Sequence, residues 1–490
     1  MSTLARKRRR DMGRQKWQFI AVLVTVVLGV ALFAGSLNAY LNLDDSLQRS
    51  YDRLGMADLT VEGADDGFAA AAAAVDGVAV VETRRSVDVP MAIGAFSFLG
   101  RVIGYPADAE LNRIDIDDGE GLDPNDPSAI VLDGNAASDF DVGVGDTVTI
   151  LGEEVTVVGI ATSPEYLWPA RDRQSIFTPP KSFAVVFAAE DLVAAGEGPA
   201  VVDEVLIRYG DDVDVGAVDD ELQDLALAAG AADVEPLEIQ PSNATIHEEM
   251  GGLRSMAVAL PMLFLAAAGM AIYVVVTRLV FTQRGVIGTL RASGFTRRTM
   301  SSHYRGVGLS VGLVGAAVGA VLGGVLARGL TAVYTAIFGI PDLVAEFHLP
   351  TVVMALLFGA VAGVVAAVPP ARTVARMAPA EAMRGDTPAA GGTVSLFERI
   401  VPPLRRAPVR WRMSLRGIGR NKKRSTSMVL GVVLGMTLIL ASWGMLDTML
   451  SAMDRQFHEV AVEDASVVFA ESVGDEQIAA VTEVAGVEHA

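Results

Sequence analysis

The sequence predicts a polytopic α-helical membrane protein with a large α+β domain outside the membrane, in which a one-plus-three span unit is followed by the start of a second repeat. Three observations predict this fold class. The 490 residues are 51% hydrophobic and their mean hydropathy is +0.40, which is too apolar for a soluble surface to hide. The apolar residues gather in long runs. The net charge is −20, and the acidic and the basic residues are concentrated in different segments of the chain.

Five stretches are long and apolar enough to cross a bilayer core, which needs about 20 residues of helix. They are residues 17–40, 256–276, 307–327, 351–368 and 426–445, the fourth being the shortest. None contains an Asp or a Glu, whose charge is costly at a helix centre. A cleaved signal peptide is the alternative for the first stretch, because seven basic residues precede it. Its apolar run is longer than the usual 7–15 residues of such peptides, which favours a span.

The distribution of Arg and Lys predicts the orientation. Residues 1–16, the loop at 278–305 and the stretch at 373–425 are strongly basic, so the positive-inside rule makes them cytoplasmic. Residues 43–254 contain 43 acidic and 11 basic residues. Alternation of the spans places this acidic segment outside a cell membrane that the chain crosses several times.

The outer segment has local signals for strands and helices. Residues 146–152 and 154–159 are two β-branched runs around a glycine turn, which is typical of a hairpin. Residues 68–75 and 219–229 are Ala-rich and favour helix. The acidic stretch 115–126 is predicted to be a solvated loop. The tripeptide Asn243-Ala244-Thr245 matches a glycosylation sequon, although motifs this short also occur by chance.

The beginning and the end of the chain share a pattern. A basic stretch, a span, an Asp-x-x-Val motif and a Val-x-Gly-Val motif follow one another from Lys16 to Val78 and again from Arg424 to Val487. A second copy of the first unit is therefore expected to begin near Arg412 and to stop before its outer domain is complete, as in a fragment of a longer protein. The expected segments are a cytoplasmic N-terminus (1–16), the first span (17–42), the outer α+β domain (43–254), three spans with the loop 278–305 (255–372), a cytoplasmic linker (373–425), the fifth span (426–447) and the start of a second outer domain (448–490).

The loop 278–305 contains an amphipathic basic segment, with apolar residues at 286, 287, 290 and 295. Its motif Ile287-Gly288-x-Leu290-Arg291-Ala292-x-Gly294 resembles the loop after the second span in the FtsX-like permease family, which includes MacB-like exporters. The stretch PARTVARMAPAEAMR at 370–384 is similar to a family signature, and Val144-Gly145-Asp146 with Val157-Val158-Gly159 resembles the MacB-like periplasmic core. One departure is Val286, where the family usually has an acid.

This resemblance implies a permease subunit of an ABC transporter. By resemblance, the six motif residues form a coupling helix that contacts a separate ATP-binding subunit, and ATP-driven movement of the outer domains exports or releases a substrate. The sequence itself contains no G-x-x-x-x-G-K-[ST] loop. ATP and Mg²⁺ are thus expected on the partner, and this chain is expected to be no enzyme and to hold no cofactor of its own.

Other function classes are weaker. A membrane-anchored regulator of a cell-envelope enzyme is the alternative that remains open, and an extracytoplasmic accessory protein is a candidate partner besides the ATPase and the bilayer. No nucleic-acid partner and no catalytic residues are expected. Because cysteine is absent and the five histidines are scattered, no metal site is expected.

Small residues repeat every fourth position inside two spans. They are Gly315, Gly319 and Gly323 in the third span, and Gly359 and Gly363 in the fourth. This spacing lets helix backbones approach closely within a membrane. Both packing inside one subunit and a sliding interface between subunits fit the pattern.

Overall fold

The computed structural model describes residues 3–64, 67–106, 108–123, 125–173, 179–194, 201–378 and 422–455. They form two compact units. Among the described residues, the helical unit comprises 3–42, 252–331, 345–378 and 422–455, and the sheet unit comprises those of 43–251 and 332–344. Most of the predicted linker 373–425 and of the predicted second outer domain 448–490 lies outside the described residues.

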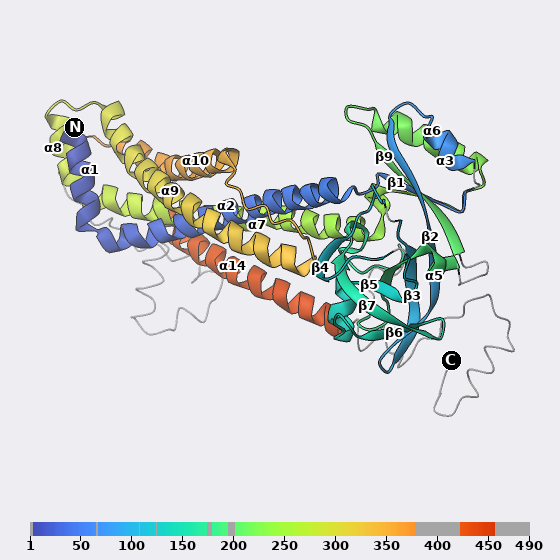
Figure 1. The fold of residues 1–490 in the computed structure, drawn as a ribbon. Coiled ribbons are helices and arrows are strands. Elements are labelled where there is room, and N and C mark those ends of the chain that lie inside the picture. The colour runs from blue at the N-terminus through green and yellow to red at the C-terminus, as the bar shows by residue number, and fades with distance from the viewer. Residues whose placement is uncertain are drawn as a thin grey trace, which may run out of the picture. The chain divides into compact units, whose positions relative to one another are not determined.

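The helical unit is built from helices of different lengths (Figure 1). They are α1 (Thr3–Arg14), α2 (Lys16–Leu54), α7 (Pro241–Thr282), α8 (Arg284–Ala292), α9 (Arg297–Ile337), α10 (Leu349–Arg376) and α14 (Lys422–Arg455). Among the described residues, five helices are long and apolar enough to span a membrane. Each of the five predicted spans lies inside one of them, so the prediction of a long apolar helix at each of these positions is confirmed.

Three of these helices are much longer than a bilayer requires. α2, α7 and α9 contain 39, 42 and 41 residues, whereas about 20 residues cover the hydrocarbon core. Residues at the ends of all three, namely 43–54, 241–251 and 332–337, belong to the sheet unit. Each of the three therefore contributes residues to both units within one helix.

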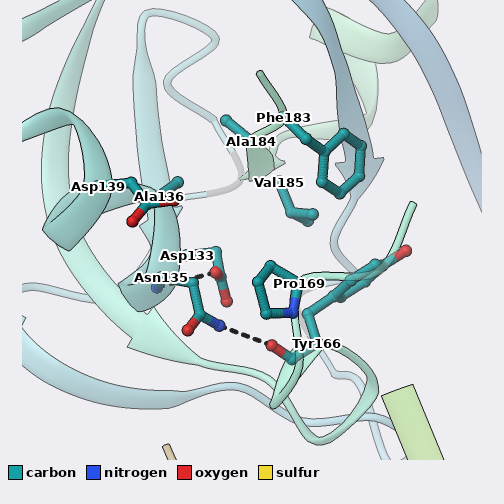
Figure 2. A pocket seen from close by; sticks show the side chains of 9 residues that line it. All are labelled: Asp133, Asn135, Ala136, Asp139, Tyr166, Pro169, Phe183, Ala184 and Val185. Atoms are coloured by element: carbon teal, nitrogen blue, oxygen red, sulfur yellow. Dashed lines mark hydrogen bonds between the residues drawn. The ribbon is translucent and has the colours of Figure 1, made fainter. Parts of the chain in front are cut away.

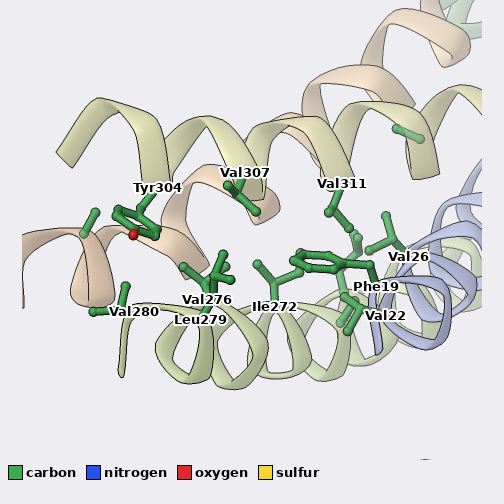
Figure 3. Packing of buried hydrophobic residues seen from close by; sticks show 14 of the residues in the cluster. Phe19, Val22, Val26, Ile272, Val276, Leu279, Val280, Tyr304, Val307 and Val311 are labelled. Carbon is green, nitrogen blue, oxygen red and sulfur yellow. The ribbon is translucent and has the colours of Figure 1, made fainter. Parts of the chain in front are cut away.

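A single buried cluster holds α2, α7, α9 and α10 together. Phe19, Val22 and Val26 of α2 pack against Ile272 and Val276 of α7, and side chains of α9 approach from the other side (Figure 3). Ala and Val dominate this cluster, which suits a membrane bundle because lipid supplies no hydrophobic force and close packing must hold the helices together.

The sheet unit contains a ten-stranded sheet (Figure 1). Nine strands follow the order β10-β1-β9-β2-β3-β8-β5-β7-β4, and β6 pairs with β2 and β7. The strands are β1 (Leu59–Glu62), β2 (Val78–Ile93), β3 (Phe96–Gly104), β4 (Asp115–Gly119), β5 (Ala129–Asp133), β6 (Thr147–Ile150), β7 (Glu153–Thr162), β8 (Val185–Ala188), β9 (Val201–Tyr209) and β10 (Asp233–Pro236). Most pairs are antiparallel, while β3 with β8 and β5 with β7 are parallel. With its helices, this is the predicted α+β domain.

Two local predictions for this unit are confirmed and one is wrong. β6 and β7 form the predicted hairpin, with Leu151 and Gly152 both at positive φ in the turn. The Ala-rich segments form α3 (Phe68–Ala72) and α6 (Val215–Ala228), whose apolar faces cover β1 and β9. The acidic stretch 115–126 is not entirely a loop, because Asp115–Gly119 forms β4 at the sheet edge. Its charged, exposed side chains suit an edge strand, since charge there discourages pairing with another chain.

Candidate coupling site

The sequence motif at 287–294 forms the short helix α8 and its C-terminal cap. One residue, Gln283, separates α8 from α7. On one face of α8, Ile287 is 1% exposed and belongs to the buried cluster of the helical unit, and Leu290 packs against that cluster. On the other face, Val286 is 48% exposed and Thr289 and Ala292 are exposed. α8 is therefore held by one face and free on the opposite one.

A glycine turn ends α8. Gly294 has a φ of 95°. Its N–H donates to the Arg291 carbonyl at 3.2 Å, and the Phe295 N–H donates to the Leu290 carbonyl at 3.2 Å. These two bonds form a Schellman motif, in which the side chains of Leu290 and Phe295 usually pack together. Here both pack on the buried cluster, so the cap and the core fix the same end of α8.

The next helix begins immediately after this cap. Thr296 Oγ1 accepts a hydrogen bond from the Thr299 N–H at 3.2 Å, which satisfies one of the free N–H groups at the start of α9. The connection between α8 and α9 is thus short and fully specified by local bonds. Arg297 and Arg298 follow it and are exposed.

Arg291 ties α8 to the end of α10. Its Nη1 donates to the carbonyl of Met377 at 2.9 Å and to that of Ala375 at 3.3 Å. These carbonyls lie at the C-terminus of α10, where the helix dipole favours a cation. Arg291 therefore forms contacts within this chain, between α8 and the end of α10.

A second polar contact holds the junction before α8. Gln283 Oε1 accepts a hydrogen bond from Lys7 Nζ of α1 at 2.7 Å and another from Tyr304 Oη of α9 at 3.1 Å. In addition, Arg8 Nη1 donates to the Gly306 carbonyl at 3.2 Å. α1 lies beside α8 for this reason (Figure 1).

The glycines of α9 face two neighbouring helices. A Cβ on Gly315 would lie 2.6 Å from Val26 Cγ1 of α2, one on Gly319 would lie 2.8 Å from Val30 Cβ, and one on Gly323 would lie 2.7 Å from Ala34 Cβ. These three glycines let α9 approach α2 inside the chain.

A second row of glycines brings α9 and α10 together. A Cβ on Gly312 would lie 2.1 Å from the Gly359 carbonyl oxygen, and one on Gly363 would lie 2.4 Å from the Gly308 carbonyl oxygen. Gly308 and Gly312 were not singled out from the sequence, although their spacing of four residues is the same signal. The spacing of the glycines in the sequence shows that α9 packs closely on neighbouring helices. It does not show which face of α9 contacts α2 and which contacts α10.

In the sheet unit, the ends of α2 and α7 are joined by a buried bond. Tyr51 Oη donates to Asn243 Oδ1 at 3.0 Å, and Asn243 Nδ2 donates to the Leu237 carbonyl at 2.7 Å. Asn243 is 4% exposed. Its amide is therefore occupied on both sides, so the asparagine of the predicted sequon is a buried, hydrogen-bonded residue in the folded protein.

The end of α2 also holds the segment after α9. Ser46 Oγ accepts from the Val344 N–H at 3.0 Å, and Ser50 Oγ accepts from the Asp342 N–H at 3.3 Å. Ser46 and Ser50 are four helical residues apart, a rise of about 6 Å, and Asp342 and Val344 are two residues apart, which is about 6.6 Å in an extended chain. Because these two distances are similar, both serines can bond to the same segment. Arg53 completes the contact, because its Nε donates to Asp342 and its Nη2 to Asp115 of β4.

The loop at 163–170 connects these helix ends to the sheet. The Tyr166 carbonyl accepts from Asn135 Nδ2 at 2.8 Å, and the Trp168 N–H donates to Ser242 Oγ of α7 at 2.8 Å. The Trp168 ring meets Phe338 edge-on. Figure 2 shows the small pocket beside this loop, which is lined by Asp133, Asn135, Asp139, Tyr166 and Phe183 among others.

Burial changes the acidity of one group in this pocket. Asp133 is 3% exposed and caps α4 (Gly134–Phe140) by accepting from the Asn135 N–H at 3.0 Å. Burial raises the pKa of Asp133 to about 7, in spite of the backbone hydrogen bonds that lower it. No group of three or more His, Asp or Glu side chains suited to a metal occurs in the described part of the chain.

Comparisons with known proteins identify the family. The FtsX-like permease C-terminal model matches residues 258–379, and the MacB-like periplasmic core domain model matches residues 19–225. Together these matches take in well over half of the chain, in the order expected from the motifs. The chain belongs to the FtsX-like permease family. It is a multi-pass membrane protein and a permease subunit of ABC transporter type.

Several solved structures are similar to this chain, with low sequence identity and low TM-scores. The periplasmic region of MacB from Actinobacillus actinomycetemcomitans is 14% identical, with a TM-score of 0.26 and coverage of 42% of this chain and 97% of that one. The extracellular domain of the transporter YknZ from Gram-positive bacteria is 13% identical, with a TM-score of 0.25 and coverage of 36% and 98%. A third structure is a domain of a permease protein from Porphyromonas gingivalis. It is 12% identical, with a TM-score of 0.23 and coverage of 38% of this chain and 87% of that one. None of the curated proteins matches.

In this FtsX-like permease, the six motif residues divide into two groups. Ile287 and Gly288 are buried and Leu290 and Arg291 are half-buried, so these four hold α8 on the helical unit. Ala292 and Gly294 are exposed. Sequence reasoning placed Val286 on the apolar face, whereas the structure exposes it together with Thr289 and Ser293.

Proposed function

We propose that this permease couples ATP hydrolysis by a separate ATP-binding subunit to movement of its outer domain, and thereby exports or releases a substrate on the outer side. The proposal rests on one observation above all, that α8 is fixed to the helical unit by Ile287, Leu290 and Arg291 and offers an opposite, exposed face. A short helix that is held in this way transmits a displacement by a partner protein to the helices that it contacts.

The exposed face of α8 is the proposed contact with the ATPase. Val286, Thr289, Ala292 and Ser293 recur at helical spacing on this face, and Arg297 and Arg298 adjoin it. The hydroxyl groups of Thr289 and Ser293 bond only to carbonyls of their own helix, at 3.0 and 2.9 Å. A neutral, small-residue face suits docking into a groove of a partner protein.

Movement would reach the outer domain along α2 and α7. Each runs unbroken from the buried cluster around α8 and α9 into residues of the sheet unit. Their outer ends are bonded to each other by Tyr51 and Asn243 and to the 163–170 loop by Ser242. We further propose that ATP and Mg²⁺ are bound by the partner, that residues 1–16 and 278–305 face the cytoplasm, and that a second repeat begins near residue 412.

The test is co-purification of the full-length permease with a candidate ATP-binding subunit in detergent. Thr289→Trp places a bulky ring on the exposed face of α8 and should abolish the complex, while Ser97→Trp, at an exposed position of β3 in the sheet unit, should leave it intact. Both variants must insert and purify normally. Equal retention of the ATPase by Thr289→Trp and wild type would contradict the proposed contact.

The alternative is a membrane-anchored regulator of a cell-envelope enzyme, driven by the same ATPase. The two functions differ in their cellular consequence. Loss of the gene should cause a cargo to accumulate if the permease exports or releases it, whereas a regulator should alter the activity of the envelope enzyme without accumulation.

A further inference from the structure

α1 has two faces of different character. Lys7, Arg8, Asp11 and Met12 form the docked face, which is buried or half-buried against the helical unit. Lys7 bonds to Asp11 and Gln283, Arg8 bonds to the Gly306 carbonyl, and Met12 packs on the buried cluster. The only acidic side chain of residues 3–16 is therefore buried and already paired.

The other face of α1 is purely basic. Arg6, Arg9, Arg10 and Arg14 are exposed and recur at helical spacing, and no carboxylate within the described part of the chain forms an ion pair with any of them. They cannot be neutralised by Asp11, because that carboxylate is only 6% exposed and is bonded to Lys7. Four arginines held together on a docked helix concentrate positive charge and attract an anionic partner.

The position of this face in the chain indicates which anion it meets. A single residue, Gln15, separates α1 from α2, and the predicted first span begins at Trp17. Trp17 is 74% exposed, and Lys16 Nζ lies 5.5 Å from the centroid of its ring. Tryptophan with a basic neighbour is typical of the headgroup region of a bilayer.

An apolar stripe continues from this point along α2. Trp17, Ile20, Val24 and Leu28 are all exposed at helical spacing, as expected for a side of α2 that faces lipid. Along the chain the order is thus basic face, aromatic residue and apolar stripe. This order corresponds to the layers of a bilayer from its surface to its core, which are phosphate, glycerol and acyl chain.

We infer that the exposed face of α1, formed by Arg6, Arg9, Arg10 and Arg14, binds the headgroups of anionic phospholipids. Arginine suits this role because its guanidinium bonds to phosphate with two parallel N–H groups. Binding at this face is independent of the ATPase contact proposed for α8. It also explains why α1 is docked on its polar side through Lys7 and Arg8, since this docking turns the remaining arginines outward.

The experiment measures phospholipid retention by the full-length protein. Wild type is purified in a neutral detergent, incubated with phosphatidylglycerol or phosphatidylcholine, and analysed by native mass spectrometry. The variant R6Q/R9Q/R10Q/R14Q removes the basic face of α1. The matched control R278Q/R297Q/R298Q/R305Q removes four exposed arginines of the same helical unit and causes the same change in net charge.

Wild type should retain phosphatidylglycerol in preference to phosphatidylcholine, and the α1 variant should lose this retention by about tenfold or more, since each basic residue at a membrane surface adds to the attraction. The control should lose much less. The variant R6K/R9K/R10K/R14K, which keeps the charge, should recover most of the retention, and added salt should weaken it.

Three results would overturn the inference. Equal retention of the two lipids by wild type would show that only the acyl chains are recognised. An equal loss in the α1 variant and the control would show a general effect of net charge. Unchanged lipid retention in the α1 variant, together with loss of the ATP-binding subunit, would assign the basic face of α1 to that protein.

Discussion

Arg84 and Glu165 form a buried ion pair with two parallel hydrogen bonds in the sheet unit. Arg84 Nη1 lies 2.8 Å from Glu165 Oε2, and Nη2 lies 2.6 Å from Oε1. Arg84 Nε also donates to Glu204 at 2.7 Å, and Ser86 Oγ donates to the other oxygen of Glu204. Burial lowers the pKa of Arg84, but the charges of the two carboxylates more than offset this and keep it well above its ordinary value. The pair fastens the 163–170 loop to β2.

Glu165→Ala should destabilise the protein strongly. It leaves Arg84 buried with one carboxylate, and breaking one side of a buried pair costs about 3–5 kcal/mol. The matched exposed pair is Arg85 with Asp203, whose side chains are 54% and 60% exposed; Asp203→Ala should cost less than about 1 kcal/mol. Thermal unfolding of the full chain in detergent measures both. Similar losses in the two variants would mean that the Arg84 network is no more important than a surface pair.

Asp133 predicts a pH dependence of stability. Its pKa of about 7 in the folded protein lies above the ordinary value of 3.8, so the folded state binds the proton more tightly than the unfolded state. The stabilising contribution is complete below about pH 4 and is lost as the pH rises through 7. Asp133→Asn retains the cap of α4 and cannot titrate. The difference in melting temperature between Asp133→Asn and wild type should therefore change between pH 4 and 7 and be constant above pH 8; a constant difference throughout would contradict the raised pKa.

Gly312→Ala should weaken the contact of α9 with α10. The added Cβ would lie 2.1 Å from the carbonyl oxygen of Gly359, a backbone atom that cannot rotate away. Overpacking of this kind costs about 1–3 kcal/mol. Gly329→Ala is the control on the same helix, because nothing lies within 4 Å of its Cβ, and it should be neutral or slightly stabilising. Melting temperatures in detergent compare the two, and equal values would show that α9 and α10 are not in close contact in the protein.

Gly294→Ala should disturb the cap of α8 without any clash. No atom lies within 4 Å of the new Cβ, but φ is 95°, a conformation that an L-residue rarely adopts, so the cost is about 1 kcal/mol. Amide exchange of Arg291 to Phe295 should accelerate, because the Schellman bonds open more often. Gly285→Ala, also in open space but without a positive φ, serves as the control and should leave exchange in this segment unchanged. Unaltered exchange in Gly294→Ala would show that the cap does not hold the end of α8.

The span helices, the β6–β7 hairpin and the basic segment at 284–298 could be predicted from the sequence because each has a local cause. An apolar run of sufficient length, two β-branched runs around Gly152, and a helical spacing of Ile287 and Leu290 are all visible within a few residues. The strand β4 was missed for the opposite reason. Its acidic side chains resemble those of a loop, and only pairing with β7 makes Asp115–Gly119 a strand.

By itself, the sequence determined the positions of the long apolar helices found among the described residues, the α+β character of the outer domain and, through its motifs, the family. Only the tertiary structure decided what each motif residue contacts. It turned Arg291 toward the end of α10, exposed Val286, paired Gly312 with Gly359, and placed Arg84 between two carboxylates from distant parts of the chain. The physical reason is that helix length, period and turn chemistry are local properties of a segment, whereas the face that a helix buries and the partner of a buried charge depend on which distant segments pack against it.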